Sequence, residues 1–551
     1  MDNRLWTAAR LMRTCRWFSA AMAVVAGCAG LVFSAAVFAV DFNVSSADEF
    51  QAALTTAAGN GADDVILLAP GIYDGNFKFV AEDSSGLAIV GAGPEQTFLD
   101  GGERAFVIFL SLKDHIADIE ISSLTIRASG ARGQSIRIDS ANTESFFRWT
   151  QEFHPLIWLK SAVIAGNMTE TPLIEGVGIE LVLSDVEILN NQSDHLLSCT
   201  DSCAVRIFDS RFEDNLRFEA NGVPGIAAGA IEIRNSYFSD VTISSERYNG
   251  GPSWLGCSIK DSVFRISGIN CQHQRFDFHG NVYDKPASSI RLMGVGNVVG
   301  NKIFDSGVLV VVDPRGEEIS ISGNLMARSF SSGVAMSLSV VDYSRLELLS
   351  NTFSSIQSIS LSPSTSGASH VVANNVVHTA RTDGLFPIDQ LVFPESSQLI
   401  NNILPSGEIG YWDQVENNVQ ADPLFFDIEG NDFHVSADSP AINAGLNSAV
   451  TDPEATDLDG NPRILDGTVD IGAYERSTTA LHPADVNGDN SISMDEFNNY
   501  NEAWRANDTW PVAPSQIPVD FVTRAGYLLQ KGGNYLNIGV GKPATWVPAN
   551  E

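Results

Sequence analysis

Twelve residues near the C-terminus, 485–496, carry oxygen donors at the spacing that a calcium loop requires. Such a loop takes its ligands from positions 1, 3, 5, 7, 9 and 12. The residues at these positions are Asp485, Asn487, Asp489, Ser491, Ser493 and Glu496. Position 7 would ligate through its backbone carbonyl, position 9 directly or through water, and position 12 through both carboxylate oxygens. The pattern predicts a Ca²⁺ site formed by these six residues.

Other residues of this segment support the interpretation. Position 6, usually glycine, is Asn490, and asparagine is the next most tolerant residue of positive φ. Position 8 is Ile492, the apolar residue through which such loops pair by a short β-bridge. A solvated acidic turn is the competing interpretation. Such a turn would not require six oxygen donors at calcium-loop positions followed by a helix. The spacing of Phe497, Tyr500 and Trp504 predicts that helix.

The loop lies in a small predicted module, residues 485–551, which follows a linker at 477–484. The end of the linker, Leu481-His482-Pro483-Ala484, cannot form the entering helix of a complete EF-hand. A second helix is predicted over Val519 to Lys531, but no acidic loop precedes it. The module therefore resembles an EF-hand or dockerin half-site with one loop. This resemblance implies a cohesin-type partner, and the missing second loop counts against it.

A short sequence motif, in which a small polar residue is followed by alternating apolar residues, recurs along most of the chain. It begins at Ser123, Asp185, Ser210, Ser236, Ser262, Asn281, Asn301, Asn324, Asn351, Asn375 and Asn402. After the first interval the spacing is 19–27 residues, as in a solenoid whose strands are in register while its loops vary in length. A β-sandwich would show turn signals every 8–12 residues. The pattern predicts an all-β parallel β-helix over residues 40–476.

This interpretation makes two structural predictions. The asparagines that begin the repeated motif, here called the ladder, should stack at equivalent corners of successive coils, about 4.8 Å apart. The apolar ladder residues should point into the core, and these are Ile303, Leu325, Phe353, Val376 and Ile403. At the N-terminal end, Ser46-Ala47-Asp48-Glu49 forms a capping box, and the apolar stripe that follows it predicts a short capping helix over the first coil.

Two turns near the N-terminus resemble a known family. The segments 64–73 and 87–94 end in Pro-Gly-Ile-Tyr and Gly-Ala-Gly-Pro. Both resemble the opening coils of the pectate-lyase-like family of right-handed parallel β-helices. Residues 421–476 are similar to the closing coils of bacterial secreted β-helix proteins of undefined activity. The resemblance is distinctive for the fold and carries little information about a reaction.

Lyases of that family need Arg or Lys as a base beside acidic residues that hold calcium against a uronate, and hydrolases use paired aspartates. Neither set is recognisable here, and His279-Gly280-Asn281 is the nearest fragment, so catalytic residues stay unknown. One hypothesis is a calcium-binding protein that binds a polysaccharide or cell-surface glycan, as in adhesion. The alternative is a polysaccharide lyase or glycoside hydrolase acting on acidic polysaccharide. Acidic residues with Arg or Lys on one exposed sheet in three adjacent coils would favour the second.

Aromatic residues gather in the interval that interrupts the rhythm between the first two copies of the motif. They are Phe146, Phe147, Trp149, Phe153 and Trp158. Rings on a protruding loop could stack on sugar rings, whereas rings on a loop that folds back would bury themselves against the helix.

The chain carries a formal net charge of −34, which argues against a nucleic-acid partner. Residues 1–39 hold four arginines, an apolar run and Val37-Phe38-Ala39, and predict a signal peptide for secretion or cell-surface export. A membrane anchor and a lipoprotein signal at Cys28 are the alternatives. No later stretch is apolar enough to span a membrane.

Four cysteines remain after the signal. An even count in an exported protein favours disulfides, and the simplest pairing is Cys199–Cys203 with Cys257–Cys271. A zinc site is one alternative, because His195 and His273 lie near the cysteines in sequence, and free thiols at Cys199 and Cys203 in adjacent turns are another.

Overall fold

The computed structural model describes residues 40–551 apart from several short segments. The segments outside the description are 103, 105, 113–116, 128–133, 141–154, 218–223, 247–255, 266–267, 285–288, 306–307, 313–317, 328–336, 342–344, 357, 363–367, 379–387, 391–395, 406–411, 437, 466, 477–480, 513, 538–542, 544–545 and 550–551. The predicted signal peptide and the aromatic residues 146–153 therefore lie outside the described residues.

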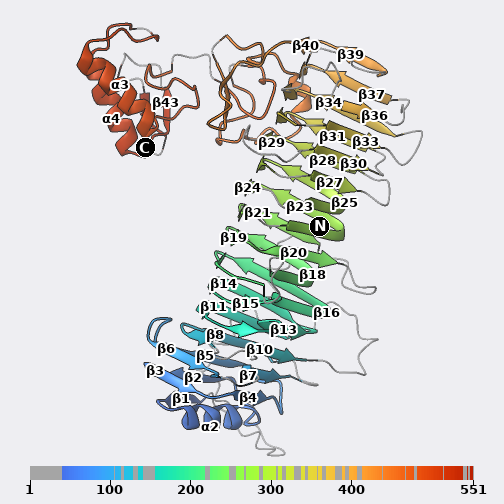
Figure 1. Cartoon of the computed structure of the whole chain (residues 1–551), viewed down its shortest axis with the longest axis vertical. Helices are drawn as coiled ribbons and strands as arrows, with labels where there is room; N and C mark the ends of the chain where they lie inside the picture. The colour runs from blue at the N-terminus through green and yellow to red at the C-terminus, as the bar shows by residue number, and fades with distance from the viewer. Residues whose placement is uncertain are drawn as a thin grey trace, which may run out of the picture. The chain divides into compact units, whose positions relative to one another are not determined.

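Thirty-eight strands pair in parallel, each with the strand one coil before and one coil after it, so the predicted parallel β-helix is confirmed (Figure 1). The strands line three faces, here called sheets A, B and C. Sheet A contains β1 (Asp41–Val44), β2 (Asp64–Leu68), β5 (Leu87–Val90), β8 (Ile119–Ser122), β21 (Cys257–Lys260), β28 (Glu318–Ser322), β31 (Arg345–Leu349), β34 (Ser369–Ala373), β37 (Ser396–Ile400) and β39 (Gln414–Glu416).

Sheet B contains β3 (Gly71–Asp74), β6 (Thr97–Asp100), β9 (Thr125–Arg127), β17 (Arg211–Glu213), β19 (Tyr237–Ser239), β22 (Val263–Arg265), β24 (Val282–Asp284), β26 (Lys302–Phe304), β29 (Leu325–Ala327), β32 (Thr352–Ser354), β35 (Val376–His378), β38 (Ile403–Leu404) and β40 (Val419–Gln420). Sheet C contains β4 (Phe77–Val80), β7 (Phe106–Ser111), β10 (Gln134–Asp139), β13 (Ile174–Val177), β20 (Thr242–Glu246), β27 (Val308–Val312), β30 (Ser337–Val341), β33 (Ser358–Ser362) and β36 (Ile388–Gln390).

Six longer strands bend from one sheet into the next. Those that run from sheet A into sheet B are β11 (Leu156–Ala165) and β14 (Glu180–Leu189). Those that run from sheet C into sheet A are β16 (His195–Phe208), β18 (Gly225–Arg234), β23 (Gly268–His279) and β25 (Ile290–Val299). A separate short pair is formed by β12 (Met168–Thr169) and β15 (Gln192–Ser193).

From β8 onward, each described coil turns from sheet A to sheet B through a single residue with positive φ, a conformation that Gly, Asn and Asp adopt most readily. These corner residues are Ser123, Ser161, Asp185, Asp209, Asn235, Asp261, Gly280, Gly300, Gly323, Ser350, Asn374, Asn401 and Asn417. The repeated motif starts one residue early in its first two copies, because Ser123 and Asp185 are corner residues rather than ladder residues.

The residue after each later corner forms the ladder. In Asn281, Asn301, Asn324, Asn351, Asn375 and Asn402 the side-chain Nδ2 donates to Oδ1 of the next asparagine, at 2.8–3.0 Å, and the series ends at Asn418. The stacking of these side chains at equivalent corners is therefore confirmed. A second ladder, Asn167, Asn191 and Asn215, stacks in the same way between sheets B and C.

The prediction that all five apolar ladder residues point inward is wrong for three of them. Ile303 and Phe353 belong to the main core, whereas Leu325, Val376 and Ile403 lie on the outer face of sheet B. Side chains alternate along a strand, so a shift of one residue reverses the face. All three are nevertheless buried, because another segment covers them.

That covering segment is residues 421–476, which follow the last coil. It contains the antiparallel pair β41 (Phe425–Asp427) and β42 (Asp432–Val435) and the short 3-10 helix η2 (Asn447–Ala449). The main chain also joins it to sheet B, because the Ala473 N–H donates to Thr352 Oγ1 at 2.9 Å. Residues that resemble closing coils in sequence thus form a cover, here called the cover segment, over the outside of sheet B.

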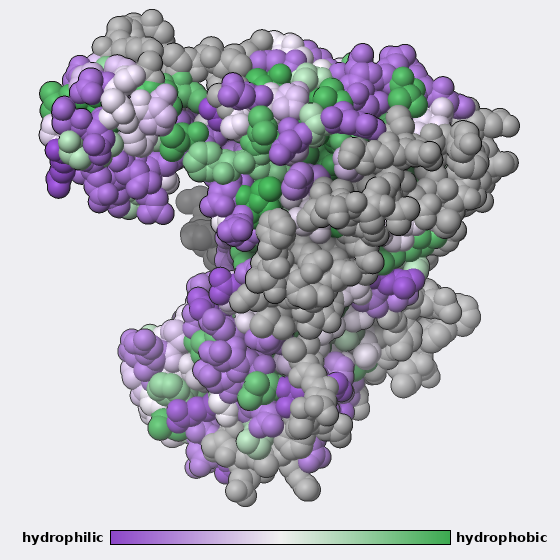
Figure 2. Space-filling model, turned by 45° about the horizontal axis from the view of Figure 1, so that its top comes forward, coloured by the Kyte–Doolittle hydropathy of each residue, from purple (hydrophilic) through white to green (hydrophobic). Residues whose placement is uncertain are grey.

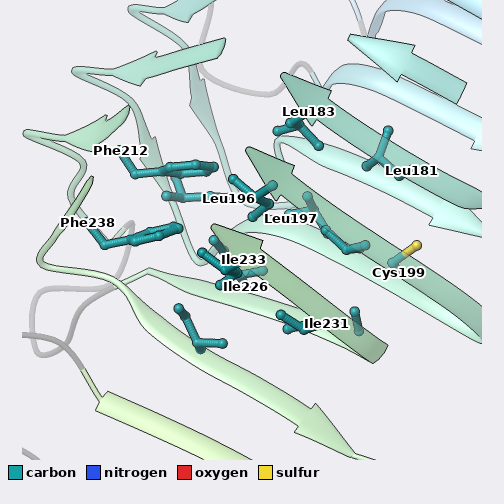
Figure 3. Close-up of a cluster of buried hydrophobic side chains, with 14 of the residues drawn as sticks. Leu181, Leu183, Leu196, Leu197, Cys199, Phe212, Ile226, Ile231, Ile233 and Phe238 are labelled. Carbon is teal, nitrogen blue, oxygen red and sulfur yellow. The ribbon is translucent and has the colours of Figure 1, made fainter. Parts of the chain in front are cut away.

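The interior of the β-helix is apolar. Figure 3 shows Phe212, Phe238, Leu197 and Ile233 directed toward one another between the sheets, and the two phenylalanine rings stack at 4.8 Å between centroids. The predicted disulfides Cys199–Cys203 and Cys257–Cys271 are confirmed. Hydrophilic residues cover much of the described surface in the view of Figure 2.

Among the described residues, α-helices occur only near the two ends of the chain. Helix α2 (Ala47–Ala57) begins at Ser46, whose Oγ accepts from the Glu49 N–H, and its Phe50 packs on the ring of Phe77 in the first coil. Helices α3 (Met494–Ala506) and α4 (Val519–Gln530) share a small core with β43 (Tyr535–Asn537) and β44 (Trp546–Pro548). None of the described helices is long and apolar enough to cross a lipid bilayer.

The ladder yields the first prediction. Replacing Asn324 by alanine leaves the buried Asn301 N–H without its acceptor and the Val298 carbonyl without its side-chain donor, and it also removes one acceptor of the Asn301 side chain. Each such group costs about 1–3 kcal/mol, so the free energy of unfolding should fall by roughly 3 kcal/mol or more. Asn297→Ala is the matched control because Asn297 is exposed on β25 in the adjoining sheet, and it should change stability by less than about 0.5 kcal/mol. Equal losses in denaturant titrations of the two variants would contradict the ladder's role.

Candidate functional sites

The predicted calcium loop is closed around its carboxylates. Asp485 is buried, and its Oδ1 accepts from the Gly488 N–H at 2.7 Å while its Oδ2 accepts from the Asn490 N–H at 3.0 Å. Asp489 Oδ1 accepts from the Ser491 N–H at 2.8 Å. The backbone therefore wraps around the first and fifth positions of the loop.

Position 12 closes the loop from the first turn of α3. Glu496 Oε1 accepts from the Val486 N–H at 3.1 Å, and Oε2 accepts from the N–H and the hydroxyl of Ser493, at 2.9 and 2.8 Å. The same carboxylate thus spans the start and the end of the loop. Side-chain hydrogen bonds within the loop link Asn487 to Asp489 and Ser493 to Glu496, and Asn490 at position 6 has the expected positive φ of 59°.

Ile492 at position 8 is buried, and its N–H donates to the Gly533 carbonyl at 3.1 Å. Nearby, the Tyr535 N–H donates to the Asn490 carbonyl at 2.9 Å. Residues 533–535, in the strand-like stretch after α4, therefore pair with the loop in place of the second calcium loop, which the sequence does not contain.

The loop concentrates negative charge. Burial, together with the neighbouring charge of Asp489, raises the pKa of Asp485 to about 7. Burial raises the pKa of Asp489 to about 6, although His434 acts in the opposite direction. Six oxygen donors with mutually repelling carboxylates are the donor set that calcium prefers, so these residues fit the ion. Among the described residues, no three His, Cys, Asp or Glu side chains already stand in a ready-made metal-binding arrangement.

A charged cluster on the cover segment lies beside the loop. The two ring nitrogens of His434 each lie 2.5 Å from a carboxylate oxygen, Nδ1 from Asp432 and Nε2 from Asp459. Burial lowers the pKa of His434, but these hydrogen bonds outweigh it and raise that pKa to about 10. At neutral pH the ring is a cation that donates to both carboxylates.

A second candidate site, which the sequence did not reveal, lies on the outer face of sheet A. Arg234, Lys260 and His279 occupy matching positions on β18, β21 and β23, so three basic side chains form one column. Two residues earlier on the same strands, a parallel column contains Glu232, Ser258 and Asp277, so its two carboxylates lie on either side of a serine.

Ion pairs cross between the two columns. The Arg234 guanidinium donates to Glu232 at 2.7 Å, and the Lys260 ammonium pairs with Asp277. The other oxygen of Glu232 lies 3.4 Å from Nε of Arg206, which is itself 3.2 Å from Glu180. Charged side chains therefore extend over five successive strands of one sheet, here called the charged face.

The charged face can be found in the sequence only when the positions of the ladder residues are known. The three basic residues stand two positions before Ser236, Ser262 and Asn281, which are consecutive ladder residues. Because every coil repeats the same corner, equal offsets from the ladder place side chains in one column. The sequence shows His279-Gly280-Asn281 as an isolated fragment of a catalytic motif, but it does not show that Lys260 and Arg234 lie beside His279.

Comparisons with known proteins add little. No protein-family model matches the chain, and no curated protein is detectably similar. Among solved structures, the PL6 family alginate lyase AlyGC is 15% identical with a TM-score of 0.33, covering 83% of this chain and 58% of its own. The Azotobacter vinelandii mannuronan C-5 epimerase AlgE6 A-module is 11% identical with a TM-score of 0.35, covering 68% and 95%.

Pectate lyase Pel9A is 11% identical with a TM-score of 0.23, covering 80% of this chain and 98% of its own. These chains are similar to the present one only at this low level, and this chain spans little more than half the length of the alginate lyase. The fold assigned above therefore rests on the strand register itself, and the activities of these proteins are not transferred to this chain.

The His434 cluster predicts a pH dependence. The imidazole has a pKa of about 10 in the folded chain and about 6.5 when unfolded, so its ion pairs stabilise the fold fully below about pH 6.5. This contribution is lost as the pH rises through about 10. His434→Gln should lower stability by about 2–4 kcal/mol near pH 6.5 and by progressively less toward pH 10. Thermal unfolding of both proteins across this range measures the difference, and a gap that does not change with pH would contradict the assignment.

Proposed function

We propose that the chain is an exported calcium-binding β-helix protein that cleaves acidic polysaccharide by β-elimination on the charged face. The observation that carries this proposal is the column of Arg234, Lys260 and His279 beside Glu232 and Asp277. It is the arrangement, acidic residues with Arg or Lys on one sheet in adjacent coils, that favours a lyase over a pure binding protein.

The chemistry assigns roles to these groups. In β-elimination a base removes the proton α to the uronate carboxylate, the electron pair forms a C=C bond, and the glycosidic C–O bond breaks. Arg234 is the group suited to hold the uronate carboxylate, because a guanidinium binds it in a bidentate manner. His279, two coils away, is the candidate for removing the proton, and the Lys260 ammonium, one coil away, is the candidate for protonating the leaving oxygen. Glu232 and Asp277 hold the basic side chains in place.

The loop at residues 485–496 supports the proposed calcium binding. The donors Asp485, Asn487, Asp489, Ser491, Ser493 and Glu496 would hold the ion, and the cation would offset the repulsion among their carboxylates. Export is supported by the pattern of residues 1–39 and by two disulfides, which persist in oxidising compartments.

Glycan binding without cleavage is a second candidate function. It is favoured by one specific observation, that Arg234 and Lys260 are already paired with carboxylates on the same sheet. Such pairs can exchange partners with a bound uronate while no proton is transferred.

The third prediction tests the charged face. Incubation with alginate or pectate should generate the ultraviolet absorbance of unsaturated uronides, and Lys260→Ala or Arg234→Ala should lower kcat/KM by at least about 100-fold. Arg345→Ala is the matched control, because Arg345 also pairs with a glutamate two residues away on sheet A, and both arginines have the same 54% side-chain exposure.

The control should keep the rate of the unchanged protein. Binding of these polymers without absorbance, lost in Arg234→Ala and kept in Arg345→Ala, would select the binding function. The absence of both binding and absorbance with either polymer would contradict the proposal.

The fourth prediction concerns calcium. Asp485→Ala combined with Glu496→Gln removes two ligand charges, so the full-length protein should lose the binding that calorimetric titration detects at calcium concentrations of about 10⁻⁴ to 10⁻³ M. Asp495→Asn is the matched control because Asp495 is an exposed acidic residue of the same segment that occupies no ligand position. The β-helix has its own core and should melt unchanged in both variants. Unaltered calcium binding by the double variant would exclude these residues as ligands.

A further inference from the structure

Arg476, the last residue of the cover segment, is bonded to two different parts of the chain at once. Its Nη1 donates to the Val435 carbonyl at 2.9 Å and to the Asn487 carbonyl at 2.7 Å. Val435 lies on β42 and is buried with Val376 and Ile403 of sheet B, whereas Asn487 is position 3 of the calcium loop. One guanidinium thus connects the loop to the outer face of the β-helix.

The loop is shaped to admit this side chain. Gly488 has a φ of +83°, and a Cβ added there would lie 2.2 Å from Arg476 Nη1. Any side chain at position 4 would therefore force the guanidinium away from the loop. Glycine at this position serves both the turn and the approach of Arg476.

A second contact runs beside the first. Asn487 Nδ2 lies 3.4 Å from Asp432 Oδ2, and Asp432 is held by His434, which also bonds Asp459. Asp459 in turn lies 3.8 Å from the Lys302 ammonium on β26. Two routes therefore lead from position 3 of the loop to sheet B, one through Arg476 and the apolar packing of Val435, and one through the polar contacts of Asp432.

We propose that calcium fastens the C-terminal helices to the β-helix, with Arg476 and Asp432 of the cover segment as the receiving surface. This inference rests on the calcium binding proposed above. Ligation by the Asn487 side chain fixes the peptide whose carbonyl meets Arg476, and the cation offsets the repulsion of Asp485, Asp489 and Glu496 that otherwise opposes the closed loop. The partner of the calcium loop is then the protein's own cover segment rather than an external cohesin-type protein.

Calcium binding by the loop and attachment of the C-terminal helices to the cover segment can be tested separately. In the full-length protein, calcium should slow amide hydrogen exchange in residues 485–496 and also in β42, which contains no proposed ligand, by about tenfold. Arg476→Gln should still bind calcium by calorimetry and protect 485–496, while the calcium effect on β42 should fall to less than about twofold. Arg505→Ala, an exposed arginine in the last turn of α3, is the control and should behave as the unchanged protein.

Asp432→Asn is a second variant, in case Arg476→Gln alters folding, and it should weaken the response of β42 in the same direction. Calcium binding with no response in β42, or an equal response in the unchanged protein and in Arg476→Gln, would overturn the fastening and leave calcium binding intact. No calcium binding by the unchanged protein would overturn both.

Discussion

The structure depends on one repeated constraint, a corner at which a single residue with positive φ precedes an inward-pointing amide or hydroxyl. Because the Asn324 side chain donates to its neighbour in the next coil and accepts from the one before, each coil fixes the register of the following coil. A buried amide without a partner is costly, so a slip of one residue would forfeit several hydrogen bonds at once. The ladder therefore sets the register, while the apolar interior supplies most of the stabilisation.

The same register produces the charged face. Side chains at a fixed offset from the corner are stacked one coil apart, about 4.8 Å, so residues distant in sequence meet in space without any loop to hold them. Arg234, Lys260 and His279 owe their column to this geometry alone. Groups carried on paired strands are held more firmly than groups on loops, which suits them to position a polymer.

The sequence predicted the coils and the ladder well, because polar corners and alternating strands leave a local pattern. It placed Leu325 and Val376 on the wrong face, since nothing in a strand of three residues reveals that a later segment covers its outside. The donors of the proposed calcium loop were recognisable because their spacing lies within twelve residues. The charged face and the contact of Arg476 with Asn487 were not, because they join residues whose proximity only the folded register or the cover segment creates.

The strong negative charge of the chain does not oppose an acidic ligand at the charged face. The cover segment, residues 421–476, contains twelve acidic and two basic residues, so much of the charge is concentrated there. Exposed charges separated by more than about 8 Å are largely screened at physiological salt, whereas a carboxylate placed on Arg234 or Lys260 interacts at contact distance. Local pairing therefore decides binding at that face, whereas the acidic C-terminal region would attract the divalent cation that we propose for its loop.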